Sequence, residues 1–192
     1  MEKILEIQQN VKAIIRKHEN NLIKLNVEVW RSIENYDNYV VSSFGRVKNT
    51  KTGKVLKASD NGHGYLKCKL YDDVIKKSHQ VHRLVACAFI DNPDDKLCVD
   101  HKDNNKANNH VSNLRFATSK ENNQNSSIRL DNISKVKGVP FHKRVKKWHA
   151  QITIDGIRIH IGYYDDLEDA KIARVNRANE AFGIYTNACE QL

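Results

Sequence analysis

The sequence lacks any apolar run that approaches the roughly 20 residues of a membrane-spanning helix. Its first ten residues, MEKILEIQQN, lack the short uncharged core of a signal peptide. The four cysteines are widely spaced and three stand in apolar strings that suit a small buried thiol, which argues against a disulfide framework. Cys98 and His101 have the spacing of half a zinc site, but no second pair accompanies them. We therefore expect an intracellular protein with no membrane partner.

Acidic residues are scarce relative to basic ones. The 32 lysines and arginines outnumber the 23 acidic residues, which gives a formal net charge of +9. Residues 46–57 carry five positive charges and no negative charge, and a second run free of acids extends over 135–147. Each phosphate that a basic side chain neutralises releases counterions, so this distribution predicts DNA as partner and two separate contact surfaces. A solvated basic surface is the alternative.

With 192 residues and 40% hydrophobic content, the chain can bury several small cores but not one large core. We therefore predict a modular α+β protein. Residues 2–25 place apolar side chains at intervals of three and four, which predicts an amphipathic helix. His18 and Asn21 interrupt the stripe, so packing on the next module is favoured, and a homodimer through this helix is the alternative.

The middle of the chain changes texture. Residues 28–77 alternate short strand-like pieces with glycine, asparagine and aspartate, which predicts a small antiparallel module. A compact apolar string at 81–90 has helical spacing and ends before Pro93. CVDH (98–101) and NLRFAT (113–118) then predict a hairpin, and Thr118 to Glu121 has the form of a capping box that begins a helix.

The last third predicts a sheet and a helix. Residues 138–144, 148–154 and 157–164 read as three strands, with a turn at Asp155-Gly156, and an amphipathic helix follows over 165–182. Residues 128–164 carry eight basic and two acidic residues, whereas 165–192 carry three and six. We therefore expect the sheet to face DNA and the helix to face away.

The hairpin and helix contain the residue types that phosphodiester hydrolysis needs. Asp100 offers a carboxylate and Asn122 an amide oxygen, both hard ligands suited to Mg²⁺, with Mn²⁺ as an alternative. Histidine is the side chain that ionises nearest neutral pH, so His101 is the candidate general base. Asn113 can accept the other ring N–H of His101 and fix its orientation.

These residues stand in a longer pattern. HRLVACAFIDNP precedes the hairpin, and VDH is followed by N-x-x-N-x-x-x-x-N-L-R-F and S-x-x-N. Residues 81–122 thereby resemble the HNH nuclease module of phage and intron-encoded homing endonucleases, which implies a ββα-metal fold. The resemblance implies that His101, Asn113 and Asn122 are the motif positions. It also implies that Asp100 and Asn122 bind one divalent ion while His101 deprotonates the attacking water.

A second resemblance lies before this module. Residues 28–57 contain a tryptophan, a Tyr-x-x-Tyr-x-Val-Ser run and a Gly-Arg-Val, like the small motif that often precedes this nuclease type. Its miniature core is expected to contain Trp30, Tyr36 and Tyr39. Its basic side chains predict phosphate contacts at Arg46, Lys48, Lys51 and Lys54.

A third resemblance covers residues 136–187, which are similar to the ethylene-response-factor type of DNA-binding domain in GV, W-x-A-x-I, I-G-Y-Y, an Ala-rich helix and FG. It implies a three-stranded sheet in the DNA major groove with the helix behind it and Trp148 in the core. Pro140, Gln151 and His160 stand where that family has Arg, Glu and Trp, so its target sequence is not implied. By position the predicted DNA contacts are Lys137, Lys143, Gln151, Thr153, Arg158 and His160, and charge adds Arg144 and Lys147.

The chain thus divides into a helix at 1–27, a small β module at 28–77, a nuclease module at 78–125, a linker at 126–135 and a DNA-binding domain at 136–192. We predict a metal-dependent, homing-type endonuclease of a virus or mobile element that selects its site on double-stranded DNA through the accessory modules. The alternative is a DNA-binding regulator that keeps the nuclease fold without activity. An RNA nuclease has less support, because no aromatic platform for splayed bases is evident.

Overall fold

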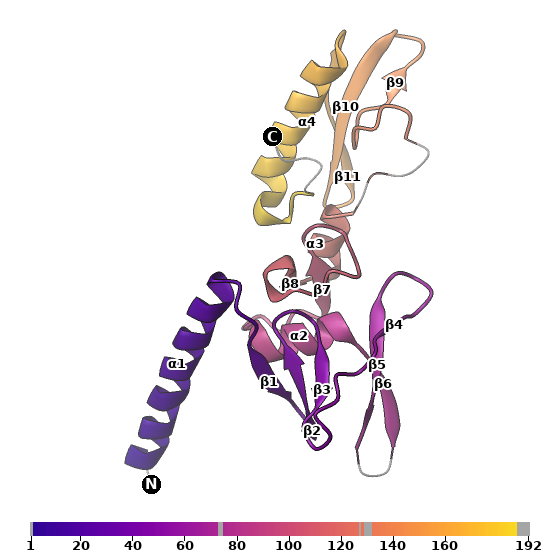
Figure 1. Ribbon diagram of the computed structural model, residues 1–192. Coiled ribbons are helices and arrows are strands. Elements are labelled where there is room, and N and C mark those ends of the chain that lie inside the picture. The colour runs from indigo at the N-terminus through magenta and orange to yellow at the C-terminus, as the bar shows by residue number, and fades with distance from the viewer. Residues whose placement is uncertain (1, 73–74, 127, 129–131, 188–192) are drawn as a thin grey trace. The chain divides into compact units, whose positions relative to one another are not determined.

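The structure is a computed structural model that describes residues 2–72, 75–126, 128 and 132–187 (Figure 1). The chain divides into two compact units. The first unit comprises residues 1–93 and 105–115, and the second unit comprises residues 94–104 and 116–192. Each unit has its own sheets and helices.

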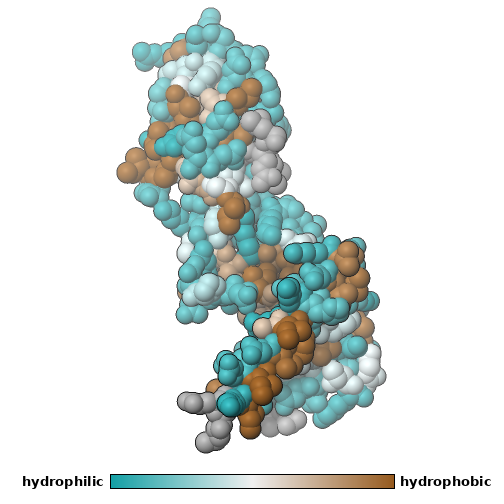
Figure 2. Space-filling view, turned by 90° about the vertical axis from the view of Figure 1, so that its left-hand side faces the viewer, coloured by the Kyte–Doolittle hydropathy of each residue, from teal (hydrophilic) through white to brown (hydrophobic). Residues whose placement is uncertain are grey.

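Helix α1 (Glu2–Lys24) begins the first unit and confirms the predicted amphipathic helix. Toward its C-terminal end, the carboxylate of Glu19 accepts two hydrogen bonds from Arg31, at 2.7 and 2.9 Å. Ile4, Ile7 and Ile14 are 61 to 69% exposed, and Figure 2 shows apolar side chains gathered along this helix. The prediction that α1 packs on the next module is therefore wrong for its first four turns, whose apolar side chains face water. The hydrogen bonds between Glu19 and Arg31 hold the helix nearer its C-terminal end.

The first antiparallel sheet has the order β1-β2-β3 and consists of β1 (Trp30–Ile33), β2 (Tyr36–Ser42) and β3 (Val47–Asn49). Tyr36 and Tyr39 on the central strand are 8 and 5% exposed, which confirms their predicted place in the core. Trp30 is half-buried instead, and the cationic groups of Lys48 and Arg46 lie 4.4 and 5.5 Å from its ring centroid. The tryptophan ring therefore serves as a platform for basic side chains.

The second antiparallel sheet of this unit has the order β4-β5-β6 and consists of β4 (Ser59–Asp60), β5 (Leu66–Tyr71) and β6 (Lys76–Gln80). Sequence patterning missed β6, because KKSHQ has no alternating apolar residues. Helix α2 (Val81–Phe89) follows at once and confirms the helix predicted at 81–90. Its Val81, Val85 and Ala86 are fully buried, and α2 contacts β1, β2, β5 and β6. This helix is thus the common core of both sheets.

The segment 105–115 completes the first unit and contains the 3₁₀ turn η1 (Val111–Asn113). The backbone N–H of Val111 donates to the carbonyl oxygen of Ser43 at 2.8 Å. Gly45 adopts a φ of +80°, and a Cβ there would lie 2.7 Å from Cβ of Asn109. Only glycine therefore allows the segment to approach the turn after β2 so closely.

The predicted hairpin and helix are present. The strands are β7 (Cys98–His101) and β8 (Leu114–Ala117), which form a two-stranded sheet, and the helix is α3 (Ser119–Gln124). Strand β7, the last two residues of β8 and α3 belong to the second unit. Thr118 and Glu121 form the predicted capping box, so the helix begins where the sequence indicated. Helix α3 packs against β7.

The rest of the second unit is an antiparallel sheet of order β11-β10-β9 with one helix against it. Its elements are β9 (Phe141–His142), β10 (Lys147–Ile154), β11 (Ile157–Tyr164), α4 (Leu167–Phe182) and the 3₁₀ turn η2 (Gly183–Tyr185). Asp155 and Gly156 have φ of 55° and 80°, as a tight hairpin turn requires. Val139, Ala150 and Ala170 form the core with Trp148 packed against them, which confirms the predicted place of that tryptophan. Strand β9 is shorter than the predicted strand 138–144, because Pro140 cannot donate to a ladder and a turn follows His142.

No helix in the part of the chain that the structure describes is long and apolar enough to span a membrane. Cys68, Cys87 and Cys98 are free thiols, whereas Cys189 lies outside the described residues. Burial raises the pKa of the Cys68 thiol to about 11, so it stays protonated at neutral pH.

Candidate functional site

Strand β7 carries the acid and the imidazole of the candidate site. Asp100 is 3% and His101 is 5% exposed, although they are adjacent and a strand points neighbouring side chains to opposite faces. Both faces of β7 are therefore covered. Asn122 lies on α3, the helix that packs against this strand, and is half-buried. The structure thus brings three of the four predicted catalytic and metal-binding residues into the second unit, on two elements in contact.

The capping box sets where Asn122 stands. The hydroxyl of Thr118 accepts a hydrogen bond from the Glu121 backbone N–H at 3.2 Å, and the Glu121 carboxylate accepts one from the Thr118 N–H at 2.7 Å. The N–H of Asn122 donates to the Thr118 carbonyl at 3.0 Å. Helix α3 has six residues, too few to be stable alone, so these bonds and its packing fix the helix.

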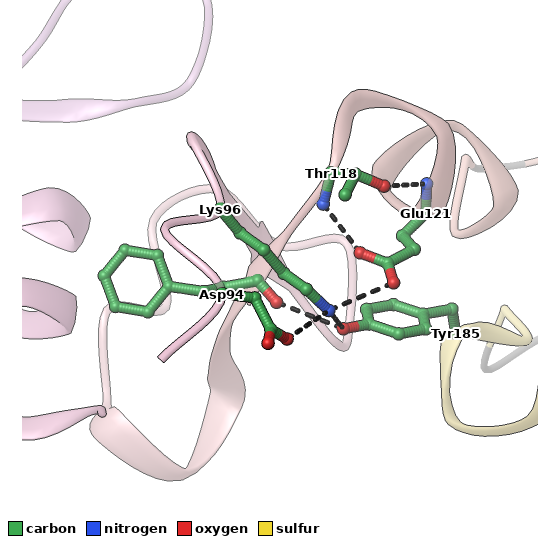
Figure 3. A network of polar contacts seen from close by, with 6 residues as sticks. Asp94, Lys96, Thr118, Glu121 and Tyr185 are labelled. Carbon is green, nitrogen blue, oxygen red and sulfur yellow. Dashed lines mark hydrogen bonds and ion pairs between the residues drawn. The ribbon is translucent and has the colours of Figure 1, made fainter. Parts of the chain in front are cut away.

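Glu121 also belongs to a polar network that extends to Tyr185 in the 3₁₀ turn η2 (Figure 3). The ammonium of Lys96 donates to the Glu121 carboxylate and to the Tyr185 hydroxyl, both at 3.1 Å. That hydroxyl donates in turn to the carbonyl oxygen of Phe116 at 3.2 Å. Burial opposes ionisation of Glu121, but the hydrogen bonds from Thr118 and Lys96 outweigh it and hold the pKa of its carboxyl below the usual value. The network therefore ties η2 to the base of α3.

Asn125, immediately beyond α3, is a site residue that sequence reasoning missed. Its side-chain nitrogen donates to both carboxylate oxygens of Asp100, at 2.9 and 3.1 Å, and to the His101 carbonyl at 2.8 Å. The segment 118–125 contains four asparagines or glutamines, and no periodicity distinguishes the one that turns inward. Its spacing of three from Asn122, about one helical turn, is the only sequence signal that could have pointed to it.

The residue types at the site suit a hard divalent cation. Asp100 and Asn122 would provide a carboxylate and an amide oxygen, which are hard ligands. The described residues contain no group of three or more His, Cys, Asp or Glu side chains placed to hold a metal. A small protein ligand set suits an ion that keeps several waters and takes phosphate oxygens as further ligands.

Asn113 belongs to the first unit, unlike the other three predicted residues. It is 8% exposed, and its side-chain nitrogen donates to the Asn108 carbonyl at 2.9 Å. This bond orients the amide within the segment 105–115. The predicted hydrogen bond from His101 to Asn113 stays a prediction.

The predicted phosphate contacts of the first unit lie just before β3, on it and in the segment after it. Arg46 forms an ion pair with Glu28, and Lys48 lies over Trp30, while Lys51 and Lys54 are exposed. A hollow of about 430 Å³ beside them is lined by five lysines: Lys54, Lys57, Lys67, Lys69 and Lys76. Sequence reasoning missed the last three, although burial of Cys68 and Leu70 follows from the strand alternation and turns Lys67 and Lys69 outward.

The sheet of the second unit presents several predicted DNA contacts on one face. Helix α4 contacts β10 and β11, and Ala150 and Ile152 are buried on that side. The register pairs Gln151 with His160 and Thr153 with Arg158, which places these four side chains on the other face. A hollow of about 670 Å³ is lined by Lys137, Gln151, Thr153 and Arg158 together with Arg174 and Phe182 of α4, so it lies at the edge of the sheet and not on the open face alone.

The remaining predicted DNA contacts differ in exposure and in the partners that they have within the protein. Lys143 and Arg144 are exposed in the turn between β9 and β10. Lys147 pairs with Asp165 at 3.0 Å, and the Lys137 ammonium donates to the carbonyls of Gln124 and Ser126. Lys137 therefore also braces the segment that follows α3.

A histidine cluster that the sequence analysis did not single out lies on the same sheet face. The imidazoles of His149 and His160 are hydrogen-bonded at 2.7 Å, and the ring of Tyr163 stacks on His149 at 4.9 Å. Burial lowers the pKa of His149, and the neighbouring His160, His142 and Arg158 lower it further. Cross-strand pairing of His149 with Tyr163 produces the cluster, which only the register reveals.

Two protein families match parts of this chain. An HNH endonuclease family matches residues 79–124, and the NUMOD4 motif matches residues 28–71. The first match contains Asp100, His101, Asn113 and Asn122, and the second contains the basic run 46–57.

Several relatives are similar over longer stretches. The chain is 40% identical over 119 residues to the DNA endonuclease I-HmuI of Bacillus phage SP01, which covers 61% of this chain and 68% of that protein. It is 46% identical over 96 residues to the uncharacterized HNH endonuclease L245 of Acanthamoeba polyphaga mimivirus, covering 50% of this chain and 29% of that one. It is 34% identical over 99 residues to the H-N-H endonuclease F-TflII of Escherichia phage T5, covering 50 and 51%. The chain thus spans less than a third of the mimivirus protein's length.

A solved structure titled DNA binding and cleavage by the HNH homing endonuclease I-HmuI also matches. Its sequence identity is 33%, and the match covers 81% of this chain and 83% of that chain with a TM-score of 0.49.

Proposed function

The chain belongs to the HNH endonuclease family, and on this premise we propose that it is a metal-dependent, homing-type endonuclease that hydrolyses phosphodiester bonds in double-stranded DNA. One observation carries the proposal. Asp100 and His101 are buried side by side on β7, and α3, which packs against this strand, carries Asn122. All three lie within the segment that the family matches.

Each residue has a role that its chemistry supports. Asp100 and Asn122 would hold a divalent ion, Mg²⁺ or Mn²⁺, which when bound supplies positive charge for the phosphate and the leaving oxygen. His101 accepts the proton of the attacking water as general base. Asn113 stays the predicted partner for the other ring N–H of His101, which would keep the imidazole in the productive tautomer, and the proposal does not depend on this contact.

Site selection is the task of the accessory surfaces. The open sheet face with Gln151, Thr153, Arg158 and His160 suits base edges and phosphates together, as the ethylene-response-factor resemblance implies. The basic side chains around β3 and β5 of the first unit suit the DNA backbone, because lysines give affinity without sequence preference. Double-stranded DNA is the proposed substrate of the protein and the proposed partner of both surfaces.

We also propose that two copies pair through α1. Four apolar side chains, Ile4, Ile7, Val11 and Ile14, stand on one stripe of this helix and are 49 to 69% exposed. Pairing would remove this stripe from water. Light scattering tests it: Ile7→Asp should convert a dimer into a monomer, and a monomeric parent protein would contradict it.

Cleavage of supercoiled plasmid DNA tests the enzymatic proposal. The full chain should convert plasmid to nicked or linear forms with Mg²⁺ or Mn²⁺ and should stop when the metal is chelated. Asp100→Ala and Asn122→Ala should lose cleavage and keep DNA binding, because the sheet contacts lie elsewhere. DNA binding by the parent protein with either metal but no cleavage would support the inactive regulator instead.

A further inference from the structure

Asn125 carries a buried, multiply hydrogen-bonded amide and lies outside both the proposed catalytic set and the predicted DNA contacts. Asn125 is 1% exposed. Its amide nitrogen lies 2.9 and 3.1 Å from the two carboxylate oxygens of Asp100 and 2.8 Å from the carbonyl oxygen of His101. One amide group therefore holds both the side chain and the backbone of the strand that carries the candidate site.

A second contact fixes the orientation of this amide. The side-chain oxygen of Asn125 accepts a hydrogen bond from the side-chain nitrogen of Asn104 at 3.4 Å. Asn104 lies in the loop after β7, and its backbone N–H donates to the His101 carbonyl at 2.9 Å. With its oxygen toward Asn104, the amide must direct its N–H₂ group at Asp100, as a hydrogen-bond donor to a carboxylate requires.

These bonds restrain the Asp100 side chain in rotation. An ionised carboxylate has about four lone-pair sites on its two oxygens, so hydrogen bonds to both oxygens are compatible with metal ligation. Hydrogen bonds to a ligating carboxylate from outside the ligand set commonly orient it in this way.

The backbone of Asn125 is restrained from the other end of the chain. The side-chain nitrogen of Asn187 donates to the Asn125 carbonyl at 2.5 Å and to the Ser126 carbonyl at 3.0 Å. Asn187 is 2% exposed, and the neighbouring Thr186 hydroxyl donates to Ala178 on α4 at 3.2 Å. A hydrogen-bonded chain therefore runs from α4 through Asn187 and Asn125 to Asp100.

We propose that Asn125 is a positioning residue for the Asp100 carboxylate, and that Asn187 keeps Asn125 in place. The inference rests on the proposed function, in which Asp100 ligates the divalent ion. Loss of such a supporting hydrogen bond typically weakens metal binding about 10- to 100-fold. The C-terminal segment thereby becomes part of the metal site although it supplies no ligand.

Metal affinity measured without DNA tests the proposal apart from catalysis. Mn²⁺ is titrated into the full chain and its variants and followed by calorimetry and by electron paramagnetic resonance of free Mn²⁺. Asn125→Ala should weaken Mn²⁺ binding about 10- to 100-fold, and excess metal should restore part of the cleavage rate. Asn123→Ala is the matched control, because it removes an exposed amide two residues before Asn125, and it should bind Mn²⁺ as the parent protein does.

Asn187→Ala is the second variant, since it leaves every group around Asp100 intact and should weaken Mn²⁺ binding to a smaller extent. Far-UV circular dichroism identifies the folded variants, and a misfolded Asn125→Ala leaves Asn187→Ala to decide. Parent-like Mn²⁺ affinity in the folded variants overturns the inference while the proposed function stands. Failure of the parent protein to bind Mn²⁺ overturns both the inference and the proposed function, and the Asn123→Ala control then also fails to bind. Mn²⁺ binding without DNA cleavage overturns the proposed function alone.

Discussion

Replacing Thr118 by alanine removes the hydroxyl that accepts a hydrogen bond from the Glu121 N–H at 3.2 Å and leaves the reciprocal bond of the capping box in place. Loss of an N-cap hydroxyl costs about 1 kcal/mol. That shifts the ratio of formed to frayed α3 by roughly fivefold. If Asn122 acts only when α3 is formed, Thr118→Ala should slow cleavage by at most about fivefold, far less than loss of the amide in Asn122→Ala.

Single-turnover plasmid cleavage and urea unfolding of the same samples measure the two effects together. Thr118→Ser keeps a capping hydroxyl and should match the parent protein in both assays. Cleavage slowed far more than fivefold in a folded Thr118→Ala would show that the hydroxyl acts on the site by more than capping α3. Equal losses in the serine and alanine variants would place the cause outside the hydroxyl, and either result refutes the reasoning.

Three further predictions concern the second unit. Arg158→Ala should weaken binding to a double-stranded DNA fragment and make the slope of log K against log salt concentration less negative by about 0.9. Lys171→Ala, on α4, should change neither the affinity nor the slope. Equal effects of the two variants would show that Arg158 does not contact DNA. The fold lowers the pKa of His149, so as pH falls the unfolded chain takes up the proton first, and the free energy of unfolding should decrease below the ordinary value of 6.5. In His149→Gln the free energy of unfolding should depend less steeply on pH than in the parent protein. The same pH dependence in both proteins would contradict this. Tyr185→Phe removes the hydroxyl between Lys96 and the Phe116 carbonyl and should cost about 1 kcal/mol in urea unfolding, whereas an unchanged midpoint would show that the network of Figure 3 does not hold η2.

Local signals predicted much of the second unit. The capping box, the Asp-Gly turn and the period of two at 148–154 and 157–164 each act within a few residues, and the structure has α3, β10 and β11 where they indicate. Strand β6 escaped because KKSHQ pairs through its backbone without an apolar alternation. Such a strand is determined by its neighbour β5, which a pattern within the segment itself does not reveal.

The candidate site divides in the same way. Asp100 and His101 follow from residue type at the end of a strand and from the family resemblance, whereas the bond from Asn125 to Asp100 depends on how α3 meets β7. Burial also separated side chains that look alike in sequence. Asn123 is exposed and Asn125 is 1% exposed, although both stand in the same polar run. Long-range packing decided between them, and no local propensity does so.

The most direct test of the account is the rate of Mg²⁺-supported DNA cleavage by His101→Ala under single-turnover conditions, with DNA and Mn²⁺ binding measured on the same protein. The account predicts parent-like binding of both and a rate at least roughly 100-fold lower, as loss of a general base implies, with partial recovery when imidazole is added. A His101→Ala protein that cuts DNA at the parent rate would contradict the account.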